Sequence, residues 1–310
     1  MDISVIICAH NPRPDYLERV LGSLRNQRLP KDKWELLVID NASEVSVASQ
    51  TDISWHPKAR HIFESELGLA PARRRGMREA VADLLVFVDD DNILDDGYLF
   101  EALTISRDWP SLGVWGSGAV SHDYEVDPPE YLREFLYYLP IRQVAAPQWS
   151  NVPSCFPAIP FGAGFCVRST VGAAYREYCA ESQIQITGRR GKNLSSGEDT
   201  EICFIACKQG FGMGVFPQLK LKHLIPKDRI SEKYLLNLVE SSVSSLLLMQ
   251  YKWNSVVPPS PFATKGLLSI LKTIMIHRGM DRRARFARLR ATAKARRLIS
   301  LIQDGRQIEG

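Results

Sequence analysis

The most constraining feature of this chain is an alternation of short apolar runs and helical patterns along its N-terminal third. β-Branched and other apolar residues predict four strands, and apolar residues at helical spacing predict two helices between them. Strands that alternate with helices form parallel sheets with right-handed crossovers and helices on both faces. We therefore expect an α/β, Rossmann-like fold. The expected strands are 3–8, 34–40, 61–64 and 85–88, and the expected helices are 15–28 and 71–85.

Polar residues follow three of these strands at the point where each one ends. Ala9, His10 and Asn11 follow the first strand, Asp40 ends the second, and Asp89–Asp91 follow the fourth. The carboxyl ends of parallel strands share one edge of a sheet, and ligands bind at that edge. The sequence therefore predicts a polar site there.

The three consecutive aspartates at 89–91 come directly after a buried apolar run. Neighbouring carboxylates repel one another, and a carboxylate removed from water needs a partner. A solvated acidic turn is one reading of this stretch, and a divalent cation site is the other. The polar residues expected at the same edge favour the cation site.

The rest of the chain predicts a second, less regular half and a helical end. We expect a long irregular loop over 139–164, a strand over 164–168, helices over 172–182 and 200–209, an edge strand over 215–223, and helices beyond about residue 230. We expect Trp115 and Trp149 to pack in the core, and the alternative for either is stacking on a sugar ring.

Composition places the chain among soluble globular proteins. Its 310 residues are 45% hydrophobic and 24% charged, and no window offers about 18 uninterrupted apolar residues for a spanning helix. The six cysteines have no paired metal spacing. Cys203 and Cys207 lie one helical turn apart in an apolar pattern, and Cys8 ends an apolar run, so we expect buried thiols there and a reducing compartment. The first residues do not read as a secretory leader, so we expect a cytoplasmic protein.

Positive charge gathers near the C-terminal end, in the run HRGMDRRARFARLRATAKARR from His277. A basic amphipathic helix is typical of a membrane-surface or partner-binding segment. The alternatives are a helix that packs on the rest of the protein and a nucleic-acid patch. We expect an anionic membrane surface as a partner, with peripheral attachment at the inner face of the plasma membrane, and no nucleic acid.

Four ordered stretches, SVIICAHNP, VIDNAS, FVDDDN and GEDTEICFIACKQGF, resemble family 2 glycosyltransferases of the GT-A fold. The resemblance covers roughly residues 1–225. It implies a GT-A catalytic domain over 1–228, with a nucleotide-sugar-binding half (1–115) and an acceptor-binding half (116–228). A helical, basic region (229–310) then follows as an extension.

The resemblance assigns roles around the aspartates. FVDDDN is similar to the family's DXD motif, which implies Asp91 as a ligand of Mn²⁺ or Mg²⁺ and Asp89 and Asp90 beside the nucleotide-sugar donor. Hard cations prefer carboxylate oxygens and share them with substrate phosphates. His223 matches, by order and context, a histidine that completes the metal shell in many GT-A enzymes; the alternative for a single histidine is a structural role.

The nucleotide base is expected against the ends of the first two strands, near Ala9, His10 and Asn11. Asp40 would accept a hydrogen bond from the base, although it can also cap the turn that follows it. In the family an arginine precedes the DXD strand, and Arg73 matches it, so it would reach the base or the phosphates. We expect the adjacent arginines, Arg74 and Arg75, to be solvated.

GEDTE resembles the family's ED motif. Asp199 would take the proton from the acceptor hydroxyl as a general base, and Glu198 would orient the site or bind the acceptor. The same residues also make a good helix N-terminus, and the two roles are compatible. FGAGFCVR (161–168) resembles the family's small-residue stretch at the acceptor side. Arg168, at its end, is expected to have a structural role.

The resemblance thus implies an inverting glycosyltransferase that moves a sugar from a nucleotide-diphospho-sugar to a glycan, lipid-linked or other hydroxyl acceptor. The nucleotide is expected to be UDP. Residues 139–196 are expected to choose the acceptor. One alternative is a Mg²⁺-dependent nucleotidyltransferase, which would show a glycine-rich phosphate loop where this chain has CAHNPRPDY. The other is a non-catalytic sugar-nucleotide binder.

Overall fold

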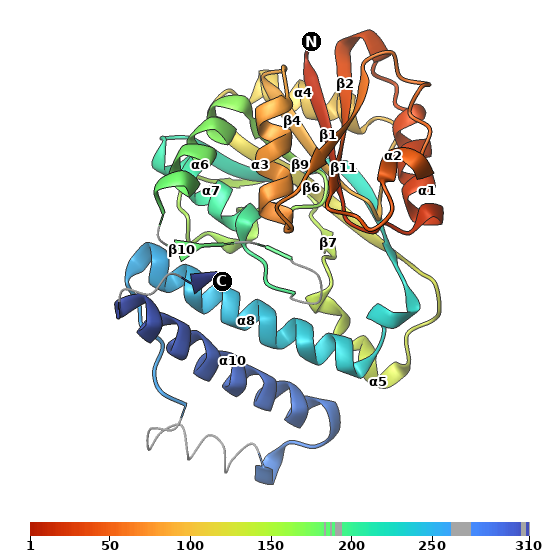
Figure 1. Ribbon diagram of the computed structural model, residues 1–310. Helices are drawn as coiled ribbons and strands as arrows, with labels where there is room; N and C mark the ends of the chain where they lie inside the picture. The colour runs from red at the N-terminus through yellow and green to blue at the C-terminus, as the bar shows by residue number, and fades with distance from the viewer. Residues whose placement is uncertain (183, 187, 190–193, 262–273, 305–307, 310) are drawn as a thin grey trace. The chain divides into compact units, whose positions relative to one another are not determined.

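A computed structural model describes the chain except residues 183, 187, 190–193, 262–273, 305–307 and 310 (Figure 1). The chain divides into two compact units. The sheet unit comprises Met1–Asp123, Pro140–Glu181 and Asp199–Ile225. The helical unit comprises Tyr124–Leu139, Ser182–Glu198 and Pro226–Gly310.

The sheet unit is built on one mixed sheet with the strand order β3-β2-β1-β4-β9-β6-β11-β5. β1 to β4 are mutually parallel, whereas β9 runs antiparallel to both β4 and β6. The short strands β7 and β8 pair with β6 and β11. The strands are β1 (Ile3–Ala9), β2 (Trp34–Asn41), β3 (Ala59–Glu64), β4 (Leu84–Asp89), β5 (Asn92–Leu94), β6 (Leu112–Tyr124), β7 (Arg142–Gln143), β8 (Gln148–Ser150), β9 (Phe165–Arg168) and β11 (Gly212–Ile225).

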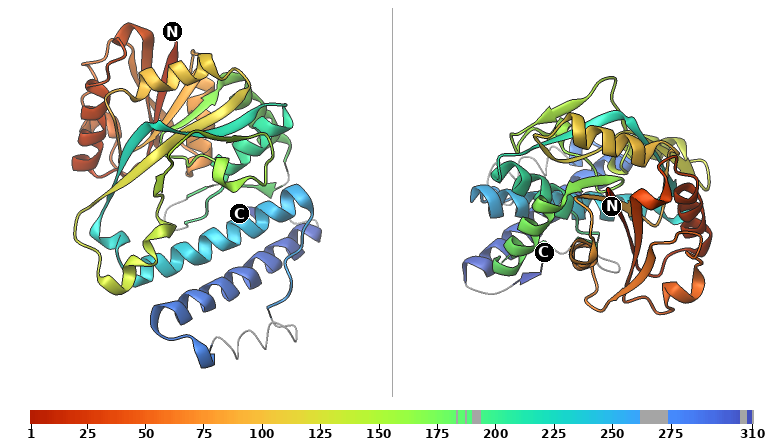
Figure 2. Two further views of the ribbon diagram at one scale, coloured as in Figure 1. Left: turned by 180° about the vertical axis from the view of Figure 1, so that it is seen from behind. Right: turned by 90° about the horizontal axis from the view of Figure 1, so that it is seen from above.

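Helices cover both faces of this sheet, as expected for the α/β class. They are α1 (Pro14–Arg25), α2 (Val47–Gln50), α3 (Leu69–Glu79), α4 (Tyr98–Asp108), α6 (Ser169–Glu181) and α7 (Glu198–Lys208), with 3-10 turns at Lys31–Lys33 and Phe156–Ala158. α3 lies in front of the sheet in Figure 1, and α4 comes to the front in the view from behind (Figure 2). Ile6 of β1 faces Gly76 of α3, whereas Val5 joins the core cluster that includes α1 and α4 residues.

Four sequence expectations need correction. β11, which was expected to be an edge strand, lies inside the sheet between β6 and β5. Its sequence resembles an edge strand because Lys220 and Lys222 are exposed. The helix expected to reach residue 85 ends at Glu79, and the next residues lead into β4. Trp149 is 56% exposed on the short strand β8, whereas Trp115 is buried in the core as expected. The long strand β6 was not expected.

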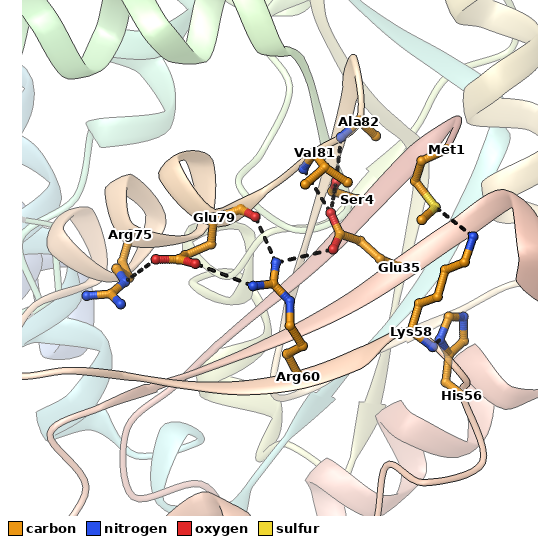
Figure 3. Close-up of polar contacts among 10 residues, drawn as sticks. All are labelled: Met1, Ser4, Glu35, His56, Lys58, Arg60, Arg75, Glu79, Val81 and Ala82. Atoms are coloured by element: carbon orange, nitrogen blue, oxygen red, sulfur yellow. Dashed lines mark hydrogen bonds and ion pairs between the residues drawn. The ribbon is translucent and has the colours of Figure 1, made fainter.

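A polar cluster joins the amino ends of the parallel strands, opposite the edge where their polar ends lie (Figure 3). Buried Glu35 accepts hydrogen bonds from Ser4 Oγ at 2.6 Å and from the backbone N–H of Val81 at 2.9 Å. Arg60 adds an ion pair to Glu35 at 3.3 Å and another to Glu79 at 3.4 Å. The cluster therefore ties the start of β4 to β1 and β2.

The helical unit is organised around two long helices that lie side by side, α8 (Glu232–Asn254) and α10 (Gly279–Gln303) (Figure 2). Ala287, Ala291 and Ala295 are buried on α10, and Arg290 forms an ion pair with Glu240 of α8 at 2.8 Å. The unit also contains α5 (Glu130–Arg133), 3-10 turns at Leu136–Tyr138 and Lys227–Arg229, and the paired strands β10 (Ile184–Gln185) and β12 (Ile308–Glu309). In the parts of the chain that the structure describes, no helix is long and apolar enough to cross a membrane.

Candidate active site

The register of the parallel strands brings the predicted polar residues to one edge of the sheet. Ala9 of β1 lies opposite Asp40 of β2, and Cys8, one residue earlier, lies opposite Asp89 of β4. The three strand ends are therefore neighbours in the order β2-β1-β4. This edge is where parallel sheets bind ligands.

The turns after β1 and β2 are bonded to each other. His10 Nδ1 donates to the carbonyl oxygen of Asn41 at 2.8 Å, and the side-chain oxygen of Asn11 accepts from the N–H of Glu44 at 2.8 Å. Asn11 adopts a φ of 47°, a left-handed conformation that asparagine tolerates better than most residues. His10 and Asn11 therefore hold a preformed turn at the ligand-binding edge.

Asp40 caps the turn that follows it. Its two carboxylate oxygens accept from the N–H groups of Ser43 at 3.1 Å and Val47 at 3.0 Å, and the residue is 5% exposed. The capping role is therefore present, and each oxygen keeps a second lone pair for a ligand.

Asn41 is a structural contributor that the sequence analysis did not single out. Its side-chain oxygen accepts from the N–H of Gly68 at 2.8 Å, and its amide donates to the carbonyl of Glu66 at 2.7 Å. Gly68 directly precedes α3, so Asn41 anchors the loop that leads into that helix. Its position directly after Asp40 was the available signal.

Arg73 of α3 points into the protein and is 2% exposed. Its Nη2 lies 3.5 Å from Asp89 Oδ1 and donates to the carbonyl oxygen of Gly162 at 3.2 Å. The guanidinium lies 5.6 Å from the ring centre of Phe87. Arg74, by contrast, pairs with exposed Glu66 at 3.5 Å.

Asp91 and His223 come together from distant parts of the chain. His223 Nε2 lies 3.3 Å from Asp91 Oδ2, and both side chains are buried. β11 sets this contact by pairing His223 with Asn92, whose side-chain amide donates to Asp91 Oδ1 at 3.1 Å. The nearby ring of His122 lies 5.9 Å from that of His223, and burial lowers the pKa of His122.

One carboxylate and one imidazole fit a divalent cation that takes its other ligands from water and substrate phosphates. Within the described residues, no group of three or more His, Cys, Asp or Glu side chains is arranged to hold a metal. The pair of Asp91 and His223 therefore fits a shared site better than an all-protein cage.

The expected helix start at the ED motif is confirmed. Gly197 has a φ of 122°, and α7 begins at Glu198, which is 4% exposed. Asp199 Oδ2 accepts from the N–H of Gly162 at 2.9 Å, and its Oδ1 accepts from the N–H of Thr200 at 2.7 Å. The stretch 161–168 therefore contacts Asp199 directly.

Arg142 is a second residue that sequence reasoning missed. It donates through Nη1 to the carbonyl of Ile159 at 2.9 Å, and its guanidinium lies 4.0 Å from the ring centre of Phe161. Burial lowers the pKa of Arg142, an effect that Cys203 and Asp199 oppose. Burial also raises the pKa of the Cys203 thiol, which favours its neutral form.

Arg168 has a structural role, as the sequence suggested. It donates from Nε to the carbonyl of Leu112 at 2.6 Å and from Nη2 to the carbonyl of Ser106 at 2.7 Å. These bonds tie β9 to the end of α4 and the start of β6.

The model of the family described as glycosyl transferase family 2 matches residues 4–159, half of this chain. The chain belongs to glycosyltransferase family 2. The resemblance seen in the four sequence stretches is thereby confirmed.

Individual relatives are distant. Glycosyltransferase AglE of Haloferax volcanii is 29% identical over 92 residues, which are 29% of this chain and 30% of that protein. The chain thus matches less than a third of that relative's length.

Two solved structures share the fold. A mannosyltransferase from Pyrobaculum calidifontis in complex with GDP-Man and Mn²⁺ has a TM-score of 0.56 at 17% identity, with 98% of this chain and 76% of that one covered. S. aureus TarS 1-349 in complex with UDP-GlcNAc has a TM-score of 0.52 at 14% identity, with 99% and 93% covered. The fold of this chain is therefore GT-A.

Proposed function

We propose that this enzyme transfers a sugar from a nucleotide-diphospho-sugar to a hydroxyl acceptor, with inversion at the anomeric carbon and with help from a divalent cation. The observation that carries the proposal is that Asp91 and His223 pair at the strand edge, while Asp199 is held separately through Gly162. A cation at the first position would stabilise a departing diphosphate, and a second, independently oriented carboxylate could deprotonate the attacking hydroxyl.

In this proposal the donor lies along the strand ends. Ala9, His10, Asn11 and Asp40 would frame the base, and Arg73, Asp89 and Asp90 would lie at the ribose and phosphates. The solved relatives include one complex with UDP-GlcNAc and one with GDP-Man, so UDP and GDP are both chemically reasonable donors. We propose UDP as the first donor nucleotide to test: Asp40 would accept from the ring N–H of uracil, and it would serve the ring N–H of guanine in the same way.

Asp91 and His223 would hold Mn²⁺ or Mg²⁺. When bound, the cation neutralises charge on the diphosphate and helps it leave. The Mn²⁺ in the mannosyltransferase complex supports this assignment by analogy of fold.

Asp199 would act as the general base. It would take the proton of the acceptor hydroxyl as that oxygen attacks the anomeric carbon, and Glu198 would bind or orient the acceptor. A single carboxylate is sufficient, because direct displacement needs no covalent intermediate.

For the acceptor we propose a glycan or lipid-linked hydroxyl, selected by residues 139–196. We further propose a cytoplasmic enzyme at the inner face of the plasma membrane. α10 buries its alanine face within the helical unit, so attachment would rest on exposed arginines such as Arg278, Arg282 and Arg297. Sedimentation with anionic but not neutral vesicles tests this; equal sedimentation with both, or none, contradicts it.

The first test is calorimetric titration with UDP, with and without Mn²⁺, on wild-type protein and Asp91→Asn. We expect wild-type binding to depend on Mn²⁺ and the dependence to disappear in the variant. Asp96→Asn is the matched control, since Asp96 pairs with Arg28 on the surface. Binding of UDP that does not depend on the metal would contradict the metal assignment. If UDP does not bind, GDP is titrated next.

The second test separates an enzyme from a non-catalytic binder or a nucleotidyltransferase. Asp199→Asn should lower turnover of the nucleotide sugar by roughly 10²–10⁴-fold, the usual contribution of a general base. UDP affinity should stay within a few-fold of wild type. Wild-type turnover in this variant would remove Asp199 from the mechanism.

A further inference from the structure

The backbone of Gly162 is bonded on both sides by residues of the proposed mechanism. Its carbonyl oxygen accepts from Arg73 Nη2 at 3.2 Å, and its N–H donates to Asp199 Oδ2 at 2.9 Å. Arg73 also lies 3.5 Å from Asp89. One residue therefore contacts both the arginine on the donor side and the carboxylate on the acceptor side.

Glycine is required here for a steric reason. A Cβ at position 162 would lie 2.5 Å from Arg73 Nη2, 3.0 Å from Nη1 and 3.2 Å from Cζ. The backbone itself is ordinary, because Gly162 lies outside the positive-φ region that Gly164 occupies at 65°. The close approach of the Arg73 guanidinium, and not a left-handed φ, is therefore what disfavours a side chain at position 162.

Moving the Arg73 side chain away from position 162 would cost free energy. It is 2% exposed and lies against Phe87, and a buried guanidinium that loses its hydrogen bonds is costly. Added atoms at position 162 would therefore displace Arg73, the Gly162 peptide, or both.

Arg142 anchors the residues just before Gly162, at 159–161. Its hydrogen bond to Ile159 and its stacking on Phe161 hold the residues immediately before Gly162. The segment 159–162 is thus held at one end by Arg142 and at the other by Arg73 and Asp199.

We propose that Gly162 is a positioning residue that fixes the distance between donor-binding Arg73 and the base Asp199, and that Arg142 holds its segment in place. This inference rests on the proposed function. Neither residue touches the reacting atoms: each acts by placing a group that does.

The test is hydrolysis of the nucleotide sugar that the wild-type enzyme turns over. In that reaction water attacks the anomeric carbon, its proton passes to Asp199, and the bond to the nucleoside diphosphate breaks. In Gly162→Ala we expect kcat to fall by about 10²-fold, as a misplacement near 1 Å produces, and donor KM to rise. Gly22→Ala, at a helical glycine with nothing within 4 Å of the added Cβ, should leave both unchanged.

A double-mutant cycle separates positioning from loss of folding. Arg73→Lys removes Nη1 and Nη2, the two atoms that lie 3.0 Å or less from the added Cβ, and puts Nζ in place of Cζ. Adding Gly162→Ala to it should therefore lower kcat by less than about threefold. An equal loss in both backgrounds, or wild-type kcat and KM in folded Gly162→Ala, overturns the proposal.

If Gly162→Ala does not fold, Arg142→Met tests the same idea without adding atoms beside Arg73. We expect a lower kcat with unchanged UDP affinity by calorimetry, and an unchanged kcat overturns the proposal. Failure of the proposed function is visible beforehand, because the wild-type protein would then neither bind UDP or GDP nor hydrolyse a nucleotide sugar.

Discussion

Single side chains at the ligand-binding edge serve the fold and the site together. Asp40 caps its turn with both oxygens, and His10 bonds to Asn41, so the residues proposed to frame the base are already rigid without it. Ligand binding to such residues costs little conformational entropy, because their rotamers are held by the protein.

A residue-scale prediction concerns His56, which is buried, lies 4.1 Å from the ring of Trp34, and accepts from the N–H of Lys58. Burial lowers its pKa from 6.5 to about 4. The unfolded chain therefore binds a proton more readily than the native one between these values. Stability from this group is complete above pH 6.5 and is lost as pH falls toward 4.

We expect His56→Asn, whose amide oxygen can accept from Lys58, to be less stable than wild type at pH 7. Its further loss of stability between pH 7 and pH 5 should be smaller than that of wild type by up to about 2 kcal/mol. Urea denaturation at the two pH values measures this. Parallel losses in the two proteins would mean that His56 does not titrate as described.

At the scale of elements, the packing of α3 on β1 places Arg73. The contact is close because Gly76 of α3 lies against Ile6: a Cβ at Gly76 would be 2.4 Å from Ile6 Cγ2. The branched Ile6 side chain is fixed in the sheet and cannot easily yield. The glycine thus lets the helix approach the strand.

Two helical glycines make a matched pair for this idea. Gly76→Ala should destabilise the protein by about 1–3 kcal/mol through overpacking. Gly22→Ala on α1, with open space around the added Cβ, should stabilise it by up to about 1 kcal/mol through helix propensity. Chemical denaturation of both variants distinguishes the effects; a neutral or stabilising Gly76→Ala would show that α3 can shift.

At the scale of the whole molecule, the proposed site couples ligand binding to stability. UDP and Mn²⁺ together at about 100 times the dissociation constant should stabilise the native state by about 2.7 kcal/mol. The melting temperature should therefore rise with both ligands, much less with UDP alone, and return on addition of EDTA. A full rise with UDP in EDTA would argue against the shared site of Asp91 and His223.

Sequence patterns alone predict the parallel strands, the polar residues at their ends and a helix N-terminus within the GEDTE stretch. These are local properties: apolar periodicity reports burial, and a strand's last residue must lie at the sheet edge. The family motifs are also local: each occupies one strand end or one helix start, so each can be identified from a short stretch of sequence.

Contacts between residues that are far apart in the sequence form only in the folded chain. The contact of Arg73 with Gly162 joins residues 89 positions apart, and that of Asp91 with His223 joins residues 132 apart. The internal place of β11 and the exposure of Trp149 were misjudged because pairing partners are not encoded in a strand's own pattern. Hydrophobic periodicity specifies which face is buried, whereas strand order specifies what lies against it.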